Sequence, residues 1–379
     1  MRNERFLALS IILGFLLLGF ILKFGNTPIV VASGTNPTAV VTADNPGAPV
    51  AVVEGSDIMA ASDDNPMSPF FKKIKISKPV TFKNLAIFPV SGLREKSTGS
   101  LASFDEAAAK KMILITEIGN GSVNELLVEN TSSKYIFIMA GEILTGCKQD
   151  RMLKDDILIP PNSGKIKVAA YCTEHGRWTS KSETFASQKT ASNIGVRQAA
   201  RATNEQGKVW AKIEKTQENV SASPATGAMN ETYQDKKVQN SMADYRKKFK
   251  DLPSLYPDMN GVIVAVNGEV LCADIFGDSV VMQKLYEKLL DSYILEALSR
   301  KDDDGKAGLN LAKAFLKNAY SADYNRIKTP GEGNLWEIKS SKIAGASLIY
   351  EKDLLHCELF PAIEQPIEKP EDGGFQRQY

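Results

Sequence analysis

Two short segments of the sequence combine acidic and basic residues in a way that chemistry can use. "GEILTGCKQDR" occupies residues 141–151, and "CTEHGRW" occupies residues 172–178. A glutamate with a raised pKa can act as a general acid or base, and arginines can hold a phosphate or carboxylate through paired hydrogen bonds. A lysine adds a point charge, and a tryptophan stacks on a planar ring or a cation. The candidates are Glu142 and Glu174 for catalysis, and Lys148, Gln149, Arg151, Arg177 and Trp178 for ligand binding.

Whether the two segments form one site depends on the strands that carry them. Apolar stretches precede both segments and predict strands, so we interpret Glu142 as the end of one strand and Glu174 as the residue after another. If those strands run parallel, both loops emerge at the same edge of the sheet, and the two glutamates share one site. The alternative is that the acids and bases pair with one another and hold two loops against the sheet. Because no nucleophile and base stand together in the sequence, enzymatic activity is left open beside simple ligand binding.

The cysteines and histidines lack the spacing of a metal site. The four cysteines contain no CxxC pair, so the sequence predicts no metal, and nothing in it indicates a cofactor. In an oxidising compartment Cys147 and Cys172 are the first candidates for a disulfide, and the alternative is four half-buried free thiols on strands. We expect His175 to be an exposed side chain and His356, within a hairpin arm, to be structural.

The N-terminus carries the strongest single signal in the sequence. Phe6–Leu22 is uncharged and apolar, close to the lower limit of about 17 residues for a helix that spans a bilayer. Arg2 and Arg5 precede it and favour a cytoplasmic N-terminus. We therefore predict a signal anchor over residues 1–25 and a folded domain outside the cytoplasm, in the periplasm or on the cell surface. The alternative is a signal peptide cleaved after Ala32, which would make the protein secreted.

The remaining chain divides by composition and periodicity. A stretch rich in Pro, Gly, Ala and Thr predicts a flexible linker, and a polar composition predicts a C-terminal tail. Strands followed by helices and hairpins favour an α+β fold. The predicted boundaries are 26–77 for the linker, 78–361 for the α+β domain and 362–379 for the tail, with a β-rich part at 78–180, a helical part at 181–252 and a hairpin, helix and hairpin at 253–361.

Several local signals support these elements. Ser103 precedes Glu106 at the spacing of a capping box, which predicts a short helix. Residues 156–172 look like a hairpin around a Pro-Pro-Asn-Ser-Gly turn. Residues 261–277 and 345–361 align without gaps as two similar hairpins, with Asp274 matching Glu358, and each forms an arm of one sheet in our interpretation.

The overall charge argues against one class of partner. The chain has 46 basic and 45 acidic residues and a formal net charge of +1. A protein with almost no net charge does not attract nucleic acid by electrostatics, so we predict no nucleic-acid partner. The predicted contacts are the membrane, through the N-terminal helix, and a small-molecule ligand, while the sequence names no protein partner.

The two opening segments also resemble a known family signature. They are similar to a prokaryotic domain family named for its association with ADP-ribosylglycohydrolases and rhodanese-phosphatases, and the resemblance spans roughly residues 78–361. It implies no defined activity, only a role near NAD or ADP-ribose metabolism. The sequence has Ile143 and Asp150 where the family commonly has glutamate and asparagine. The matching positions are Gly141, Glu142, Gly146, Lys148, Gln149, Arg151, Cys172, Glu174, Gly176, Arg177 and Trp178.

Two hypotheses follow from the sequence. In the first, an anchored extracytoplasmic domain binds, or binds and hydrolyses, a small anionic, nucleotide-like or sugar-like ligand at the two loops. It predicts a concave pocket into which Arg151 and Arg177 point. In the second, the protein is a non-enzymatic scaffold or interaction module of the cell envelope, and the same charges are paired internally.

Overall fold

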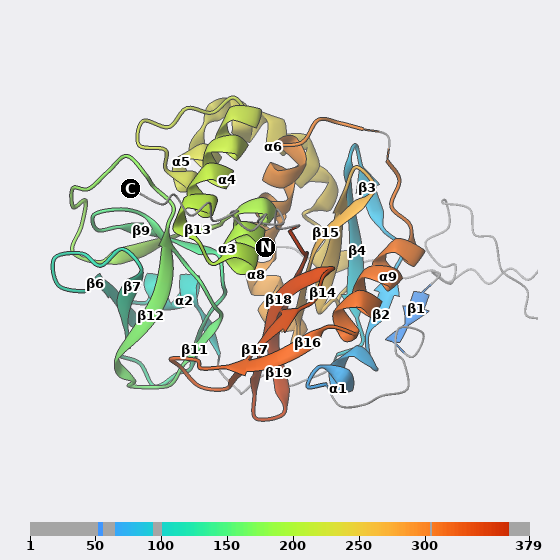
Figure 1. Cartoon of the computed structure of the whole chain (residues 1–379), viewed down its shortest axis with the longest axis horizontal. Helices are drawn as coiled ribbons and strands as arrows, with labels where there is room; N and C mark the ends of the chain where they lie inside the picture. The colour runs from blue at the N-terminus through green and yellow to red at the C-terminus, as the bar shows by residue number, and fades with distance from the viewer. Residues whose placement is uncertain (1–51, 56–64, 94–100, 304, 364–379) are drawn as a thin grey trace, which may run out of the picture. The chain divides into compact units, whose positions relative to one another are not determined.

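The computed structural model describes residues 52–55, 65–93, 101–303 and 305–363 (Figure 1). All of them belong to one unit, Val50–Tyr379. The predicted anchor at 1–25 and most of the predicted linker and tail lie outside the described residues. Within the described part, no helix has both the length and the apolar composition that crossing a bilayer requires.

The largest element is a ten-stranded sheet that combines the first four strands of the chain with six strands from its C-terminal part. Its strand order is β1-β2-β4-β14-β15-β19-β18-β17-β16, with β3 paired to β4, and every pair is antiparallel. The strands are β1 (Val52–Glu54), β2 (Lys75–Ser77), β3 (Val80–Phe82), β4 (Leu85–Ser91), β14 (Gly261–Val266), β15 (Glu269–Phe276), β16 (Asp323–Ile327), β17 (Asn334–Lys339), β18 (Ile343–Tyr350) and β19 (Asp353–Pro361).

The two similar hairpins predicted from the sequence are neighbours at the centre of this sheet. They are β14–β15 and β18–β19, and β15 pairs with β19 so that Asp274 lies opposite Glu358. Asn267 and Gly268 both have positive φ, 52° and 79°, as a type I′ turn requires. The prediction that both hairpins are arms of one sheet is confirmed.

The β-rich half contains two smaller sheets around their own core. The six-stranded sheet has the order β13-β9-β10-β12-β7-β6, and the three-stranded sheet has the order β11-β8-β5. The capping box at Ser103 and Glu106 is present and begins α2 (Phe104–Ala109) as predicted. The strands are β5 (Ala102–Ser103), β6 (Ile113–Glu117), β7 (Glu125–Asn130), β8 (Ile136–Ile138), β9 (Glu142–Gly146), β10 (Arg151–Leu153), β11 (Ile157–Ile159), β12 (Gly164–Cys172) and β13 (Phe185–Ala191).

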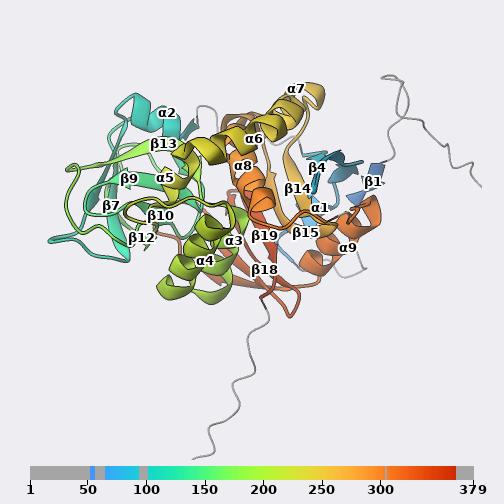
Figure 2. The same ribbon diagram turned by 90° about the horizontal axis from the view of Figure 1, so that it is seen from above.

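The helices cover both faces of the large sheet, and α8 (Ser279–Leu298) lies between that sheet and the β-rich half (Figure 2). Asp278 caps α8 by accepting a hydrogen bond from the backbone N–H of Val280, as predicted. The side chains of β14 alternate between two cores, so this strand is buried on both faces. The other helices are α1 (Ser68–Phe71), α3 (Ile194–Thr203), α4 (Gln206–Asn219), α5 (Met229–Gln234), α6 (Lys236–Phe249), α7 (Leu252–Leu255) and α9 (Leu309–Tyr320).

Three predictions about the elements and their boundaries need correction. The fold begins before Lys78, because Met67, Phe70 and Phe71 bury their side chains in the core behind the large sheet. The predicted hairpin at 156–172 does not form: β11 pairs with β8, and β12 pairs with β7 and β10. Pro160 and Pro161 follow β11 and lack N–H donors, so they cannot extend a ladder between the two arms. The helical part is preceded by a strand, β13.

Candidate functional site

The strand directions bring two of the predicted loops together. β9 and β12 each pair antiparallel with β10, so they run in the same direction on either side of it. The loops that follow them therefore leave the same edge of the sheet, as we expected. Glu142, however, is the first residue of β9 and not the end of a strand, so it lies at the other end of β9 from that loop. The structure does not bring Glu142 and Glu174 together.

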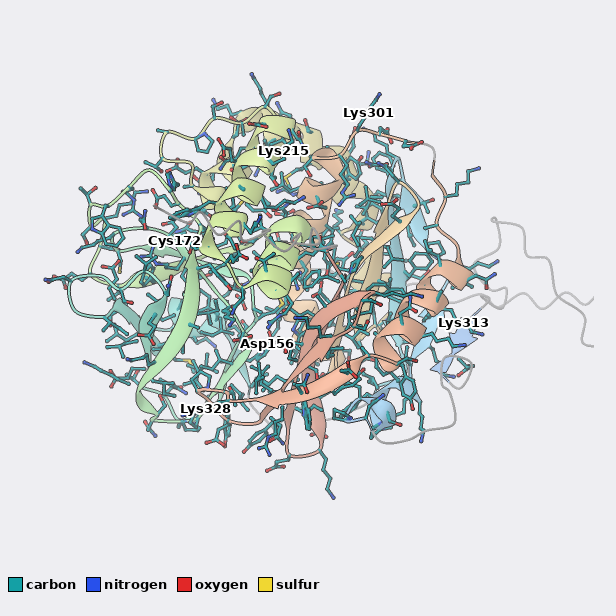
Figure 3. All side chains as sticks on the ribbon, in the orientation of Figure 1. Asp156, Cys172, Lys215, Lys301, Lys313 and Lys328 are labelled. Carbon is teal, nitrogen blue, oxygen red and sulfur yellow. The ribbon has the colours of Figure 1, made fainter. Side chains whose placement is uncertain are left out.

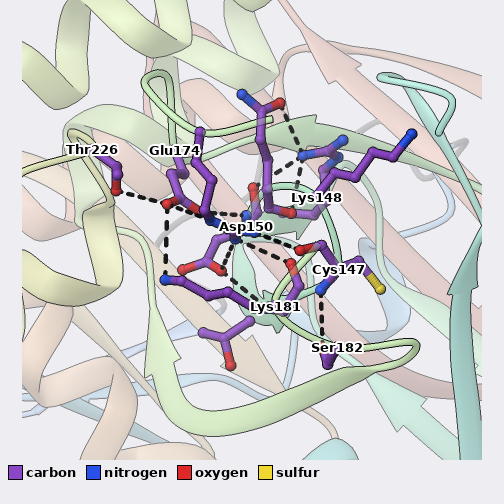
Figure 4. A network of polar contacts seen from close by, with 12 residues as sticks. Cys147, Lys148, Asp150, Glu174, Lys181, Ser182 and Thr226 are labelled. Carbon is purple, nitrogen blue, oxygen red and sulfur yellow. Dashed lines mark hydrogen bonds and ion pairs between the residues drawn. The ribbon is translucent and has the colours of Figure 1, made fainter. Parts of the chain in front are cut away.

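Arg177 is the centre of a loop clasp, which we define as Glu174, Arg177, Asp150 and Thr226. Its Nε donates to Oε1 of Glu174 at 2.8 Å, and its Nη2 donates to Oε2 at 2.5 Å. The guanidinium also donates to the backbone carbonyls of Gly146, Cys147 and Thr179 (Figure 4). Arg177 is only 7% exposed. We predicted that its guanidinium points into an open pocket, but in the structure it is surrounded by hydrogen-bond acceptors of the protein.

Glu174 is fully buried and accepts hydrogen bonds on both carboxylate oxygens. Beyond those from Arg177, the backbone N–H of Asp150 donates to Oε2 at 2.9 Å and Thr226 Oγ1 donates to Oε1 at 2.6 Å (Figure 4). Burial opposes ionisation of Glu174, but the bonds from Arg177 and Thr226 outweigh it and lower the pKa. A carboxylate held ionised and fully bonded is suited to tying loops together, and not to accepting a proton.

Lys148 and Trp178 form the exposed part of this edge. The Nζ atom of Lys148 lies 5.4 Å from the centroid of the Trp178 ring and donates to the backbone carbonyl of Asn120. Trp178 is 48% exposed. The pair is a cation–π contact on the surface, in which Lys148 occupies one face of the Trp178 ring.

Arg151 lies beneath this edge and is fully buried. Its Nη1 donates to the backbone carbonyl of Gln149 at 3.0 Å, and its Nη2 lies 3.9 Å from Oε1 of Glu117. The Nε and Nη2 atoms have no hydrogen-bond partner among the described residues. The Arg151 guanidinium therefore lies beneath the two loops, where neither solvent nor a ligand reaches it.

The two cysteines of the predicted disulfide are free thiols. Cys147 packs in the core of the β-rich half, while Sγ of Cys172 donates to Oε1 of Gln149 at 3.3 Å. Burial raises the pKa of each thiol to about 11. The disulfide that we considered possible between Cys147 and Cys172 is not formed, and the two side chains have separate surroundings. In the described part of the chain, no group of His, Cys, Asp and Glu has the geometry of a metal site.

Glu142 forms a different buried ion pair, with Lys288 of α8. The two atoms Oε2 and Nζ are 2.5 Å apart, and Lys288 also contacts Asp105 at 2.7 Å. Burial raises the pKa of Glu142, although the charge of Lys288 opposes that shift. The pair links β9 to the central helix, and neither side chain reaches solvent.

A larger buried polar network joins the two halves of the fold, and the sequence did not predict it. Nδ1 of His356 lies 2.9 Å from Oδ2 of Asp156, and its Nε2 lies 3.3 Å from Oδ1 of Asp274. Asp274 also accepts from Tyr293 at 2.6 Å and from Arg197 at 3.1 Å. Burial alone would lower the pKa of His356, but the two carboxylates raise it to about 9. The imidazole is therefore charged and bonded at both nitrogens.

Arg201 extends this network towards the surface. Its Nη1 donates to Asp155 at 2.7 Å, its Nε donates to Glu358 at 2.8 Å, and its Nη2 donates to the backbone carbonyl of Lys154 at 3.1 Å. The network thus ends at the segment Lys154–Asp156, which lines an open cavity.

That cavity is an inter-sheet cleft, which we define as two adjoining cavities between the β-rich half and the strands β16 and β17. Their volumes are about 700 and 230 Å³, and they share Lys154, Ile327 and Glu337. Asp156 and Lys328, both of which line the larger cavity, lie between the two halves in Figure 3. The backbone N–H of Glu332 donates to the carbonyl of Leu158 at 2.8 Å and bridges the two halves.

Gly331 is required for this bridge. A Cβ atom at that position would lie 2.2 Å from the carbonyl oxygen of Leu158, so any side chain would force the two segments apart. The chain therefore holds the segment after β16 against β11 at a fixed distance.

Most charges that line the inter-sheet cleft are paired. Lys167 contacts Glu125 at 3.5 Å, Arg201 binds Asp155, and Asp156 binds His356. Among the described residues, no acidic partner contacts Lys154, Lys328 or Lys339, and Glu337 is the one acidic lining residue that is also unpaired. The cleft therefore has an excess of free positive charge.

No curated protein and no solved structure matches the chain. One family model matches residues 73–360, most of the described part of the chain. Its range begins within the segment before β2 and ends in β19, so it includes both halves of the fold and the inter-sheet cleft. The chain belongs to the family of the ARG and Rhodanese-Phosphatase-superfamily-associated Protein domain, as its motifs indicated.

Proposed function

We propose that this domain binds a small organic anion, such as a nucleotide or a sugar phosphate, in the inter-sheet cleft. The observation that carries the proposal is the group of three lysines, Lys154, Lys328 and Lys339, that line the cleft without an acidic partner in the described structure. Unpaired lysines around a concave surface attract an anion, because the low-dielectric walls strengthen the interaction.

The walls of the cleft favour a ligand with an apolar or ring-shaped part. Ile166, Val168, Ile327 and Pro330 line the larger cavity beside the charged residues. A pocket with a few charged groups and an apolar wall holds ligands that combine a charged group with a ring. A volume of about 700 Å³ is within the range of known small-molecule sites.

The proposed ligand class is the one inferred from the sequence, but the proposed binding site is the inter-sheet cleft and not the two loops. Arg177 donates to six protein acceptor atoms and Arg151 is fully buried, so neither guanidinium is offered to a ligand at the two loops. Glu142 and Glu174 are bonded to Lys288 and Arg177, which leaves no free general base there. We therefore propose a binding domain and assign no hydrolytic step.

The family supports the ligand class in a limited way. Its name records an association with ADP-ribosylglycohydrolase and rhodanese-phosphatase systems. The two names refer to ADP-ribose and to phosphate, which are both anionic, so an ADP-ribose-like or phosphorylated ligand is the first to test.

For the location, we propose that residues 1–25 anchor the domain to a membrane and place it outside the cytoplasm. The support is the apolar run Phe6–Leu22 preceded by Arg2 and Arg5. Protease accessibility in intact cells tests this: a domain that is degraded only after lysis would contradict it.

Binding can be tested with the full-length chain by isothermal titration calorimetry against ADP-ribose, AMP, ribose 5-phosphate and the neutral nucleoside adenosine. We expect the anions to bind and adenosine to bind at least tenfold more weakly. Lys154→Gln and Lys328→Gln should each weaken anion binding about tenfold, since each removes a charged contact. Lys236→Gln, at an exposed position of α6, is the matched control and should leave binding unchanged. Equal binding of adenosine and AMP, or unchanged binding in both cleft variants, would contradict the proposal.

A further inference from the structure

A second cavity lies on the outer side of the loop clasp. Its volume is about 400 Å³, and it is formed by the loop after β12, by α4 and by the segment around Thr226. Thr226 donates to Glu174 and its backbone carbonyl accepts from the N–H of Gly176, so the clasp fixes one wall of this cavity. The cavity is separate from the inter-sheet cleft, with which it shares no lining residue.

Two aromatic rings form a corner in this cavity. The ring centroids of His175 and Trp210 are 4.4 Å apart, and their planes meet at 82°. Both residues line the cavity. Aromatic faces carry negative electrostatic potential, and proteins bind quaternary ammonium groups in sites lined by aromatic rings.

The charge of the cavity has the sign that such a corner prefers. Glu214 is the only acidic residue of the lining, and the lining contains no lysine or arginine. Glu214 follows Trp210 by four residues on α4, so the two side chains lie on the same face of the helix. No basic residue in the described structure forms an ion pair with Glu214, whereas Glu218, one turn further on, contacts Lys215 at 3.1 Å. A carboxylate without a partner beside a tryptophan face recognises a cation.

We propose that this cavity is a second binding site, specific for a small organic cation that carries a trimethylammonium or amine group. Trp210 and His175 contact the cationic group, and Glu214 balances its charge. The site differs in charge and in place from the anion site of the inter-sheet cleft, and it extends the function of the chain to a ligand of the opposite sign.

The experiment compares choline with 3,3-dimethylbutan-1-ol, which has the same shape and hydroxyl but no charge. Titration calorimetry with the full-length chain should detect choline binding, and the neutral analogue should bind at least tenfold more weakly, because it loses the cation–π and carboxylate contacts. Equal binding of the two compounds would overturn the proposal, since the cavity would then recognise shape alone. Absence of choline binding to the folded parent protein would overturn it as well.

Matched variants locate the binding. Glu214→Gln and Trp210→Leu should each reduce choline affinity about tenfold, whereas Glu218→Gln, on the same helix and next to a lysine, should leave it unchanged. The thermal midpoint of each variant shows whether it is folded. Because Glu214 is exposed and unpaired, Glu214→Gln is expected to fold like the parent, and an unchanged choline affinity in that folded variant would refute the site.

Discussion

Nδ1 of His356 lies 2.9 Å from Oδ2 of Asp156, two side chains that are 200 residues apart in the sequence and fully buried in the structure. Asp156 belongs to the segment that follows β10, and His356 belongs to β19 of the large sheet. The contact therefore joins the two halves of the fold. Asp274 contacts the other ring nitrogen, so the charged imidazole is held between two carboxylates.

This arrangement predicts a dependence of stability on pH. The pKa of His356 is raised to about 9 in the folded protein, above the value of about 6.5 for an unfolded histidine. Its contribution to the free energy of unfolding is thus complete below about pH 6.5 and is lost as the pH rises through about 9. The shift corresponds to on the order of 3 kcal/mol. Urea unfolding at intervals from pH 6 to pH 8 measures the slope below the range in which thiols of the unfolded chain ionise, and His356→Gln should flatten it. A parent protein with constant stability over this range would contradict the assignment.

The loop clasp predicts a loss of stability when either charge is removed. Arg177→Ala leaves Glu174 buried without its main partner, and we expect it to reduce the free energy of unfolding by about 3 to 5 kcal/mol. Trp178→Ala is the neighbouring control and should cost less than about 1 kcal/mol, since Trp178 is 48% exposed. Denaturant unfolding distinguishes the two. Parent-like stability of Arg177→Ala would show that the clasp does not hold the loops.

The buried pair of Glu142 and Lys288 predicts strong coupling between β9 and α8. Lys288→Met should destabilise the fold by about 3 kcal/mol, because it leaves Glu142 buried without its basic partner. Glu142→Gln should cost less, because Asp105 still contacts Lys288. The double variant should be more stable than the sum of the two effects implies, and a double-mutant cycle measures the difference. Additive effects would mean that the two charges do not interact. Lys284→Met is a suitable control on the same helix, because the contact of Lys284 with Glu106 is partly exposed.

The four buried thiols predict slow reaction with alkylating reagents. Cys147, Cys172, Cys272 and Cys357 are all free and buried, and burial raises the pKa of every one. At neutral pH the native protein should react with a maleimide far more slowly than the urea-unfolded protein, in which all four thiols become labelled. Intact-mass spectrometry counts the labels. Two labels fewer in the unfolded, unreduced protein would reveal a disulfide.

Features that depend on local periodicity could be predicted from the sequence. The hairpins around Asn267 and at 345–361, the cap of α8 and the capping box at Ser103 follow from short-range rules, and all are present. The approach of the loops after β9 and β12 was predicted only on the condition that the two strands run in the same direction, and in the structure they do. These signals lie within about 20 residues of one another in sequence.

Features that depend on distant partners could not be predicted. The partner of Arg177 was among its near neighbours, but those of Glu142 and His356 are Lys288 and Asp156, far away in the chain. The inter-sheet cleft is formed by β12 and by the segment after β16, which meet only through the fold. Periodicity gives the buried face of each element but not the element that it packs against.

The position of α8 has a consequence for how the chain acquires its structure. One hydrophobic core contains residues of the β-rich half, such as Phe137 and Ile143, together with Val262 of the large sheet and Leu289 of α8. A fragment that ends near residue 180 would lack the helix that completes this core. The two halves are therefore expected to melt in one cooperative transition, and the growing polypeptide reaches a protease-resistant state only after α8 has been synthesised.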